Sequence, residues 1–313
     1  MNIQHSQNEP ELTVIIPAFN EACGILTFLD LLQAALSGCC ADFEVLVIDD
    51  GSRDETWPLV RDAASHFSWL RCLRFTRNFG KEAAVLAGLR HARGQAVVVM
   101  DADGQHPPEL LPKLLAPWRS GSAHIVAAQK KCGTVSLMSR FNTYTFNRLM
   151  HALTGLDLAN ASDYRLLDRS VVNALLAFPE KVRFFRGMTV WTGYSMVQVE
   201  FEVAPRIAGT SQWSTGQLTR LAIIAITGYS AKPLSMIFWL GIFGMAAALL
   251  LFLQAIYSWL AGTAVSGWSS LTVVILFFGS ANLLGVGVLG AYLAQIFDEI
   301  KRRPEYIVGE TVE

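Results

Sequence analysis

The sequence predicts an α/β fold with a mostly parallel sheet, followed by a segment that associates with a membrane. In the first half of the chain, short apolar runs alternate with helical patterns of about ten to fifteen residues, which is typical of βαβ units. In the second half, residues 233–297 include no Asp, Glu, Lys, Arg or His. A helix needs about 20 apolar residues to cross a bilayer, so this stretch can form two such helices and a short turn.

The apolar runs and the helical periodicity locate the elements of the sheet region. The expected strands are residues 12–17, 43–48, 69–75 and 96–100. The expected helices run from about residue 25 to 36, onward from Asp54, and from 80 to 89. Right-handed crossovers bring the carboxyl ends of parallel strands to one edge of a sheet, and ligands bind at that edge.

The strongest candidate site directly follows the fourth expected strand. Asp101 and Asp103 leave the end of that strand, and Gln105 comes two residues later. Strand alternation points these three side chains to roughly the same side. Oxygen donors in this position suit Mg²⁺ or Mn²⁺ carrying a diphosphate. An isolated Asp-x-Asp could equally be an acidic turn facing solvent, so its neighbours must decide.

Polar clusters also follow the other expected strands. They are Asn20-Glu21, Asp49-Asp50 and Arg77-Asn78. Together with the acidic cluster, these coincidences favour a site over solvated loops. No Gly-x-Gly-x-x-Gly opens the first helix, and no Gly-x-x-x-x-Gly-Lys-Ser/Thr occurs, so neither a dinucleotide fold nor a P-loop is supported. We therefore expect phosphates to be held through a metal ion.

Basic residues are concentrated in the middle of the chain and beside the long apolar stretch. Most of them fit solvated faces with a few ion pairs. Arg165 and Arg206 are better candidates for anion contact, because each is flanked by turn or strand residues and would face the acidic edge. Arginine forks suit phosphate oxygens.

The composition agrees with a membrane-associated cytosolic protein. The chain is 52% hydrophobic and 16% charged, with a mean hydropathy of +0.36, which is too apolar for an ordinary soluble protein. Its five cysteines include no Cys-x-x-Cys pair, which indicates reduced thiols and not a disulfide frame or zinc site. The N-terminus is polar, so no signal peptide is expected. No nucleic-acid partner is expected either.

The second half divides into a linking region and a helical hairpin. We expect a loop and an interfacial helix in residues 206–232, with a buried core helix as the alternative for 218–229. The transmembrane helices should cover about 234–260 and 268–297. Lys232 precedes them and Lys301-Arg302-Arg303 follows, so the positive-inside rule places both termini in the cytoplasm. Residues 1–205 would then form a cytosolic domain and 298–313 a cytosolic basic tail.

Several motifs carry a resemblance to a known family. The chain resembles the family 2 glycosyltransferases, with their Rossmann-like GT-A fold, in Val14-Ile-Ile-Pro-Ala-Phe-Asn-Glu21, Val47-Ile-Asp-Asp-Gly-Ser52, Arg77-Asn-Phe-Gly-Lys81 and Asp101-Ala-Asp-Gly-Gln-His-Pro-Pro108. More narrowly, it resembles the polyisoprenyl-phosphate glycosyltransferases, namely dolichyl-phosphate mannose synthases and bacterial undecaprenyl-phosphate glucosyltransferases. The bacterial branch is matched by Ser162-Asp-Tyr-Arg-Leu166, Arg206-Ile-Ala-Gly-Thr-Ser211 and Lys301-Arg-Arg-Pro-Glu-Tyr-Ile307.

The resemblance implies a role for each matching residue. The residues implied for the nucleotide-sugar pocket are Pro17, Asn20, Glu21, Asp50, Lys81 and Asp101, with Asp50 near the base or ribose. Those implied for the divalent metal are Asp101, Asp103 and Gln105. Those implied for the phosphates, including that of the lipid acceptor, are Arg140, Arg165, Arg206 and Ser211. Asp163 would join Asp101 and Asp103 as a catalytic residue by orienting the acceptor or a sugar hydroxyl, and a structural cap is the alternative.

Two positions depart from the family pattern. Gly104 stands where relatives usually carry Leu, and Gln212 stands where a Lys often follows the Ser, so one expected phosphate cation is absent.

The implied reaction is an inverting transfer of a hexose from a nucleotide sugar, preferably UDP-glucose, to undecaprenyl or other polyprenyl phosphate. Other UDP-hexoses, their N-acetyl forms and GDP-mannose are alternatives. The product would be a lipid-phosphate-linked sugar for cell-envelope glycan modification, made by a homotetramer at the bacterial cytoplasmic (inner) membrane.

Three other functions fit the sequence less well. A processive polysaccharide synthase would need a Gln-x-x-Arg-Trp motif and more spans. A non-catalytic membrane scaffold is disfavoured by the intact acidic motif, and an Asp-x-Asp-x-Thr/Val phosphatase by Gln105.

Overall fold

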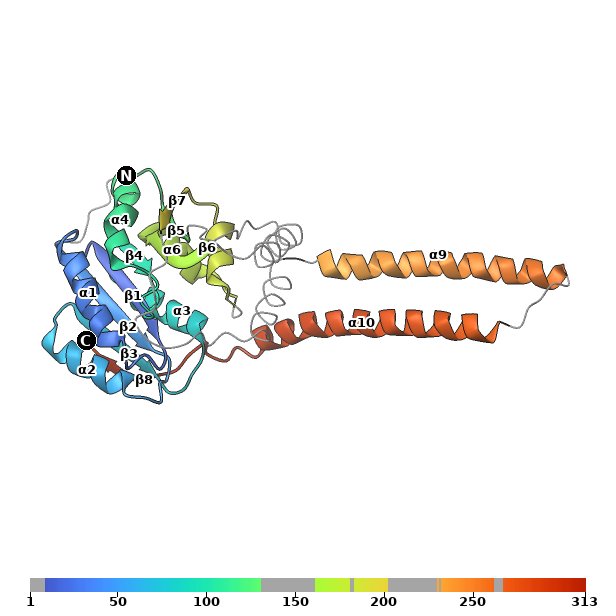
Figure 1. Ribbon diagram of the computed structural model, residues 1–313, viewed down its shortest axis with the longest axis horizontal. Helices are drawn as coiled ribbons and strands as arrows, with labels where there is room; N and C mark the ends of the chain where they lie inside the picture. Colours follow the sequence, from blue (N-terminus) through green and yellow to red (C-terminus); the bar gives the residue numbers. More distant parts are fainter. Residues whose placement is uncertain (1–8, 131–160, 181–182, 202–229, 231, 262–266) are drawn as a thin grey trace. The chain divides into compact units, whose positions relative to one another are not determined.

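The computed structural model describes residues 9–130, 161–180, 183–201, 230, 232–261 and 267–313 (Figure 1). These residues fall into two compact units. The first, called the sheet unit, contains the described residues up to 201 together with 303–313. The second, called the helical unit, contains the described residues from 230 to 302.

The sheet unit is built on an eight-stranded sheet with the strand order β7-β5-β6-β4-β1-β2-β3-β8. The strands are β1 (Leu12–Ala18), β2 (Phe43–Asp49), β3 (Leu70–Phe75), β4 (Ala96–Val99), β5 (Ile125–Lys130), β6 (Ala161–Asp168), β7 (Met196–Phe201) and β8 (Val308–Val312). The central strands β4, β1, β2 and β3 are parallel, as predicted. β7 is also parallel to β5. β6 runs antiparallel to both β4 and β5, and β8 runs antiparallel to β3.

Helices cover both faces of this sheet. They are α1 (Ile25–Ser37), α2 (Thr56–His66), α3 (Lys81–His91), α4 (Leu111–Arg119), α6 (Arg169–Ala177), α7 (Phe185–Trp191) and the short 3-10 helix η1 (Pro108–Leu110). The expected helix from Asp54 begins at Thr56, because the Asp54 carboxylate accepts the Thr56 N–H just before the first turn.

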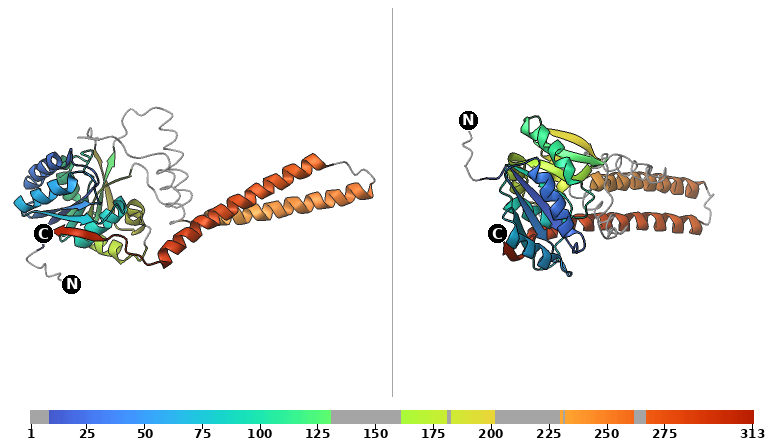
Figure 2. Two further views of the ribbon diagram at one scale, coloured as in Figure 1. Left: turned by 90° about the horizontal axis from the view of Figure 1, so that it is seen from below. Right: turned by 60° about the vertical axis from the view of Figure 1, so that its left-hand side comes forward.

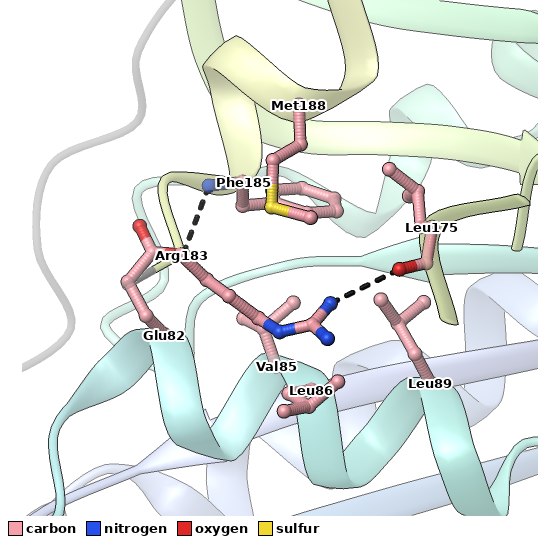
Figure 3. Close-up of a pocket in the computed structure, with 8 residues that line it drawn as sticks. All are labelled: Glu82, Val85, Leu86, Leu89, Leu175, Arg183, Phe185 and Met188. Carbon is pink, nitrogen blue, oxygen red and sulfur yellow. Dashed lines mark hydrogen bonds between the residues drawn. The ribbon is translucent and has the colours of Figure 1, made fainter. Parts of the chain in front are cut away.

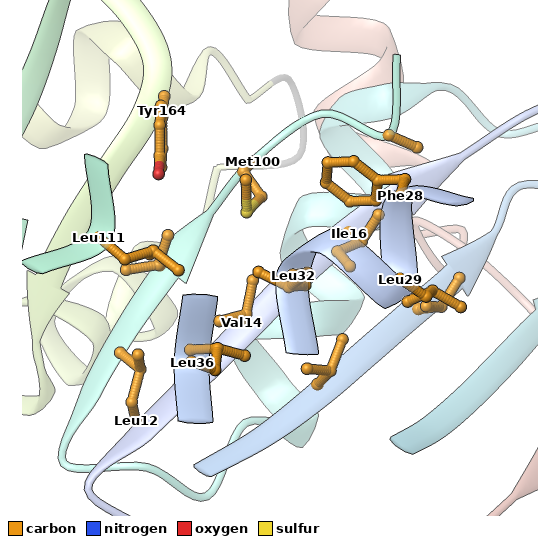
Figure 4. Close-up of a cluster of buried hydrophobic side chains, with 14 of the residues drawn as sticks. Leu12, Val14, Ile16, Phe28, Leu29, Leu32, Leu36, Met100, Leu111 and Tyr164 are labelled. Atoms are coloured by element: carbon orange, nitrogen blue, oxygen red, sulfur yellow. The ribbon is translucent and has the colours of Figure 1, made fainter. Parts of the chain in front are cut away.

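Strand alternation in β1 divides the core between the two faces. Val14 and Ile16 join Phe28 of α1 in the main hydrophobic cluster, to which α2 and α4 also contribute (Figure 4). Ile15 points to the other face, where α3 packs so closely that a Cβ at Gly88 would collide with the Ile15 side chain. A parallel strand buried on both faces is therefore apolar at successive positions, which explains the continuous run in the sequence.

The helical unit consists of α9 (Lys232–Leu260) and α10 (Trp268–Ile300). Both helices are long and apolar enough to cross a membrane, judged by length and composition. They pack closely at Gly244, where a Cβ would lie 2.7 Å from a ring carbon of Phe278. The expected interfacial helix lies outside the described residues.

The C-terminal residues differ from the expected basic tail. Residues 303–313 belong to the sheet unit, and β8 adds a strand at the edge formed by β3. Backbone pairing and partly buried side chains explain this, since Val308 and Val312 are both half-buried in the strand.

Candidate active site

The turns after β1 and β2 interlock at the carboxyl edge of the sheet. Asn20 has a left-handed backbone (φ 56°). Its N–H donates to Ser52 Oγ at 2.9 Å, and its Oδ1 accepts the Arg53 N–H at 2.9 Å. Gly51 also has a positive φ of 68°, and a Cβ there would lie 2.5 Å from the Arg77 carbonyl carbon. The loop after β3, residues 77–80, therefore packs directly against the Gly51 backbone.

Asp50 holds the loop of residues 77–80 in place. Its two carboxylate oxygens accept the N–H groups of Phe79 at 2.7 Å and Gly80 at 2.9 Å. Burial raises the pKa of Asp50 to about 6, although the two amide bonds act in the opposite direction. Asp50 therefore supports the loop that leads to Lys81. Its expected contact with the base or ribose stays a prediction.

Two carboxylates and two cations gather where β4, β6, α3 and α7 meet. Lys81 Nζ lies 2.5 Å from Asp101 Oδ1 and 2.7 Å from Asp163 Oδ2. Arg186 binds both oxygens of Asp163, with Nε at 2.6 Å and Nη2 at 3.0 Å. Burial alone would raise the pKa of Asp163, but Lys81 and Arg186 outweigh it and hold the pKa well below its usual range. We call these four residues the charged cluster.

His106 connects the acidic motif to β6. Its Nδ1 accepts the Asp101 N–H at 2.9 Å, so the proton of the neutral ring lies on Nε2, 3.1 Å from Ser162 Oγ. Burial lowers the pKa of His106, which favours this neutral form. The ring also stacks on Tyr164, with centroids 5.0 Å apart. His106 thus fixes the backbone of Asp101 relative to the residue before Asp163.

The acidic motif itself is partly ordered by its own turn. The Gln105 N–H donates to Asp103 Oδ1 at 3.0 Å. Asp101, Asp103 and Gln105 are all partly exposed, as residues that meet a ligand must be. Glu21 and Pro17 lie at the same edge, and the Glu21 N–H donates to Thr56 Oγ1 at 2.8 Å.

Arg165 is not placed to bind an external phosphate. The side chain is buried, and its Nε donates to the Ser162 carbonyl at 2.9 Å. Its Nη1 donates to Thr189 Oγ1 and to the Arg186 carbonyl. The structure therefore does not support the expectation that Arg165 receives the lipid phosphate. The residue instead ties α7 to β6 and so helps to place Arg186 on Asp163.

A small apolar pocket is lined by residues of α3, α6 and α7 (Figure 3). Polar groups beside this pocket give α7 a second support. Glu82 Oε2 accepts the Phe185 N–H at 2.9 Å at the start of α7. Burial, and then the charge of Asp163, raise the pKa of Glu82 to about 7. Across the pocket, Arg183 donates to the Leu175 carbonyl at 3.0 Å and the Phe178 carbonyl at 2.8 Å. The charged cluster is thus held from behind by polar groups that do not face the site.

Residues 13–176 match the family model described as glycosyl transferase family 2. This chain belongs to glycosyltransferase family 2. The GT-A-like α/β fold with a mostly parallel sheet, expected from the sequence, is likewise confirmed.

Three relatives of this family 2 glycosyltransferase are each 34% identical to it over nearly their whole length. They are an uncharacterized glycosyltransferase of Synechocystis sp. (96% of this chain and 95% of the relative), a putative glycosyltransferase of Bacillus subtilis (96% and 91%) and the SfII prophage-derived bactoprenol glucosyl transferase of Shigella flexneri (96% and 98%).

The donor chemistry of the acidic motif fits a hard divalent cation. Asp101 and Asp103 offer carboxylate oxygens two residues apart, and Asp101 already accommodates a positive charge, that of Lys81. In the part of the chain that the structure describes, no three His, Cys, Asp or Glu side chains are grouped as a metal site. A cation held by these two carboxylates would take the rest of its coordination from a diphosphate and water, as Mg²⁺ commonly does.

Sequence reasoning found part of this site and missed part of it. Lys81, Asp101 and Asp163 come together as a group, whereas Arg140, Arg206 and Ser211 lie outside the described residues. Arg186 and His106 were not singled out. Arg186 belongs to a basic run that looks like a solvated face, and nothing in the sequence reports its bond to Asp163. His106 had a better signal, because it directly follows the acidic motif.

Proposed function

We propose that this family 2 glycosyltransferase transfers a hexose, with inversion, from UDP-glucose to a polyprenyl phosphate at a membrane surface. The product would be a lipid-phosphate-linked sugar. The observation that carries the proposal is the charged cluster, in which Lys81 lies 2.5 Å from Asp101 and Arg186 binds Asp163 beside it. The bactoprenol glucosyl transferase of Shigella flexneri, 34% identical over 96% of this chain, supports the choice of sugar and acceptor.

The chemistry suits such a cluster because the reaction brings two anions together. A lipid phosphate is already anionic at neutral pH, so it needs no strong general base. Lys81 and Arg186 would offset the negative charge of the acceptor and orient its oxygen for in-line attack on the anomeric carbon. Asp163 keeps both cations in place. Attack from the side opposite the leaving group would convert an α-linked donor into a β-linked product.

Asp101 and Asp103, with Gln105, would hold Mg²⁺ or Mn²⁺ at the end of β4. When bound, the cation would stabilise the charge that develops on the nucleoside diphosphate leaving group. His106 would keep the Asp101 backbone fixed during this step, since its Nδ1 accepts the Asp101 N–H.

The helical unit supports a location at the membrane. α9 and α10 are long and apolar enough for two crossings. Strands on both sides of this hairpin, β3 and β8, pair in one sheet. Two crossings return the chain to its starting side, so we place the sheet unit and both termini in the cytoplasm, with the nucleotide sugar. A homotetramer, implied by the family resemblance, is the proposed assembly.

The test uses purified protein in detergent with undecaprenyl phosphate, Mg²⁺ or Mn²⁺, and radiolabelled UDP-glucose. Other UDP-sugars and GDP-mannose serve as competing donors. We expect label from UDP-glucose in the organic phase, and its loss with EDTA or with Asp103→Ala. Transfer from a different donor would replace the sugar but keep the reaction. A folded protein that binds UDP yet forms no lipid product from any donor would contradict the proposed acceptor.

A further inference from the structure

The C-terminal strand β8 follows the two long helices and pairs with β3, on the same side of the sheet as β2 and its turn of residues 49–52. β8 pairs antiparallel with β3, and Glu310 stands opposite Arg74 in the register. Figure 1 labels β8 next to β3, and the left view of Figure 2 shows β8, in red, at the edge of the sheet near the C-terminus. Neither the acidic motif nor the charged cluster includes any residue of this segment, so its role is not explained by the proposed chemistry.

Glu310 is fixed by donors from two different elements. Its Oε1 accepts from Arg74 Nη1 at 3.1 Å, and its Oε2 accepts from Trp57 Nε1 at 3.1 Å. The same arginine reaches the turn after β2. Arg74 Nε lies 3.4 Å from Asp49 Oδ2, and Nη2 donates to the Ser52 carbonyl at 3.4 Å. The guanidinium therefore stands between the C-terminal strand and the turn of residues 49–52.

The turn of residues 49–52 depends on the position of Arg74. Asp49 is fully buried, and its Oδ1 accepts the Ser52 N–H at 3.1 Å. Within the described residues, its Oδ2 has no hydrogen-bond partner, so the charge that faces it is that of Arg74. A buried carboxylate without a compensating charge is costly. Displacing Arg74 would therefore disturb the turn on which Asn20, Ser52 and Asp50 are arranged.

A second line of contacts runs from the same segment to the loop of residues 77–80. Tyr306 stacks on Phe75 with centroids 5.0 Å apart, and Phe75 meets Phe79 edge-on at 5.7 Å. The Phe79 N–H is one of the two donors to Asp50. The Thr76 N–H also donates to the Ile307 carbonyl at 3.0 Å. The loop that leads to Lys81 is thus packed against the C-terminal segment.

We propose that residues 303–313 hold in place two loops, residues 49–52 and 77–80, that bind the nucleoside diphosphate sugar. Glu310 is a positioning residue that acts through Arg74 on the turn of residues 49–52. Tyr306 is a positioning residue that acts through Phe75 and Phe79 on the loop of residues 77–80. The inference rests on the proposed function for the identity of the ligand, and it adds that the donor site needs the chain beyond the membrane helices.

The main test compares Glu310→Gln with Glu313→Gln in the full-length protein. Glu313 is the matched control, because it contacts Arg71 and Arg93 and has no contact with the turn of residues 49–52. We expect Glu310→Gln to weaken UDP and UDP-glucose binding, measured by calorimetry, by about threefold to fivefold, since the pair with Arg74 is partly exposed. The control should stay within about 1.5-fold of wild type, and the KM for undecaprenyl phosphate should not change in either variant.

A double-mutant cycle with Arg74→Gln separates positioning from a general loss of stability. If Glu310 acts through Arg74, Glu310→Gln should have no further effect on UDP affinity in the Arg74→Gln background. Additive effects in the cycle would contradict the route through Arg74. Tyr306→Leu should also weaken UDP binding, because it loosens the packing of the loop of residues 77–80.

Wild-type UDP affinity in both Glu310→Gln and Tyr306→Leu would overturn the inference. Because binding of UDP is measured directly, this result is distinct from a failure of the proposed function. A wild-type protein that forms no lipid product while Glu310→Gln weakens UDP binding would refute the proposed acceptor and leave the inference standing.

Discussion

Asp163→Asn tests whether the charged cluster orders the site. Asparagine keeps the shape of the side chain but removes the charge that binds Lys81 and Arg186. The Asp163 side chain is only 12% exposed, and breaking a buried ion pair costs about 3–5 kcal/mol. Lys81 keeps Asp101 as a partner, so we expect the lower value, about 3 kcal/mol. For a domain of this size class, that loss lowers Tm by about 6–12 °C.

The same substitution should lower the rate of lipid-linked sugar formation by about 100-fold, because both cations lose the group that fixes them. The effect on stability should also depend on pH. The pKa of Asp163 is held below its ordinary value of 3.8, so the ionised carboxylate stabilises the fold above about pH 4. As pH falls further, towards the lowered pKa, the difference in Tm between wild type and Asp163→Asn should shrink.

Asp168→Asn is the control for these measurements, since it places the same substitution on the same strand. Asp168 accepts the Ser170 N–H at 2.9 Å as the N-cap of α6 and the Trp118 indole N–H at 2.8 Å. Asparagine caps helices about as well, so the loss should stay below about 1 kcal/mol and the activity should not change. If Asp163→Asn is as stable as this control and within threefold of wild-type activity, the cluster does not order the site.

Three further substitutions test other parts of the site. Glu82→Gln should flatten the pH dependence of Tm. Because the pKa of Glu82 is raised to about 7, the protonated carboxyl stabilises the fold at low pH, and this stability is lost as pH rises through 7. The Tm of the variant should therefore rise relative to that of wild type at pH 8. Gly51→Ala should weaken UDP binding by at least about tenfold, because its Cβ would collide with the Arg77 backbone. The control is Gly121→Ala, which has a similar φ but open space around it. This control should cost only about 1 kcal/mol of stability and leave UDP binding unchanged. Arg165→Gln should lower the free energy of unfolding by about 3 kcal/mol, measured by chemical denaturation, because it removes a buried charge-assisted network; a raised KM for undecaprenyl phosphate at wild-type stability would instead restore Arg165 as an acceptor contact.

The central strands and the acidic edge could be predicted because their physics is local. A strand buried on both faces must be apolar at successive positions, and 96–100 shows this run directly before Asp101. The carboxyl ends of parallel strands meet by topology alone. The sequence therefore predicted that Arg77-Asn78 and Asp101 would lie at one edge, and the family resemblance added Lys81.

The parts that could not be predicted depend on contacts between distant residues. Arg165 lies on an antiparallel strand between β4 and β5, and alternation alone cannot tell which of its faces α7 covers. Asp50 has two backbone partners in a loop far along the chain, and its sequence neighbours do not indicate them. β8 is short and follows a long apolar segment, and nothing near it indicates that β3 is its partner.

The pairing of Cys72 with Val312 also has a consequence for how the protein is made. β8 follows α9 and α10 in the chain, so the ribosome synthesises it after both helices. Until then β3 is an open edge, with unpaired backbone groups that could join strands of other chains. Contacts across so long a stretch of sequence also form slowly, because the intervening chain must first be closed into a loop. The sheet unit therefore completes its fold only after α9 and α10 have been made, and the β3 edge stays unpaired until then.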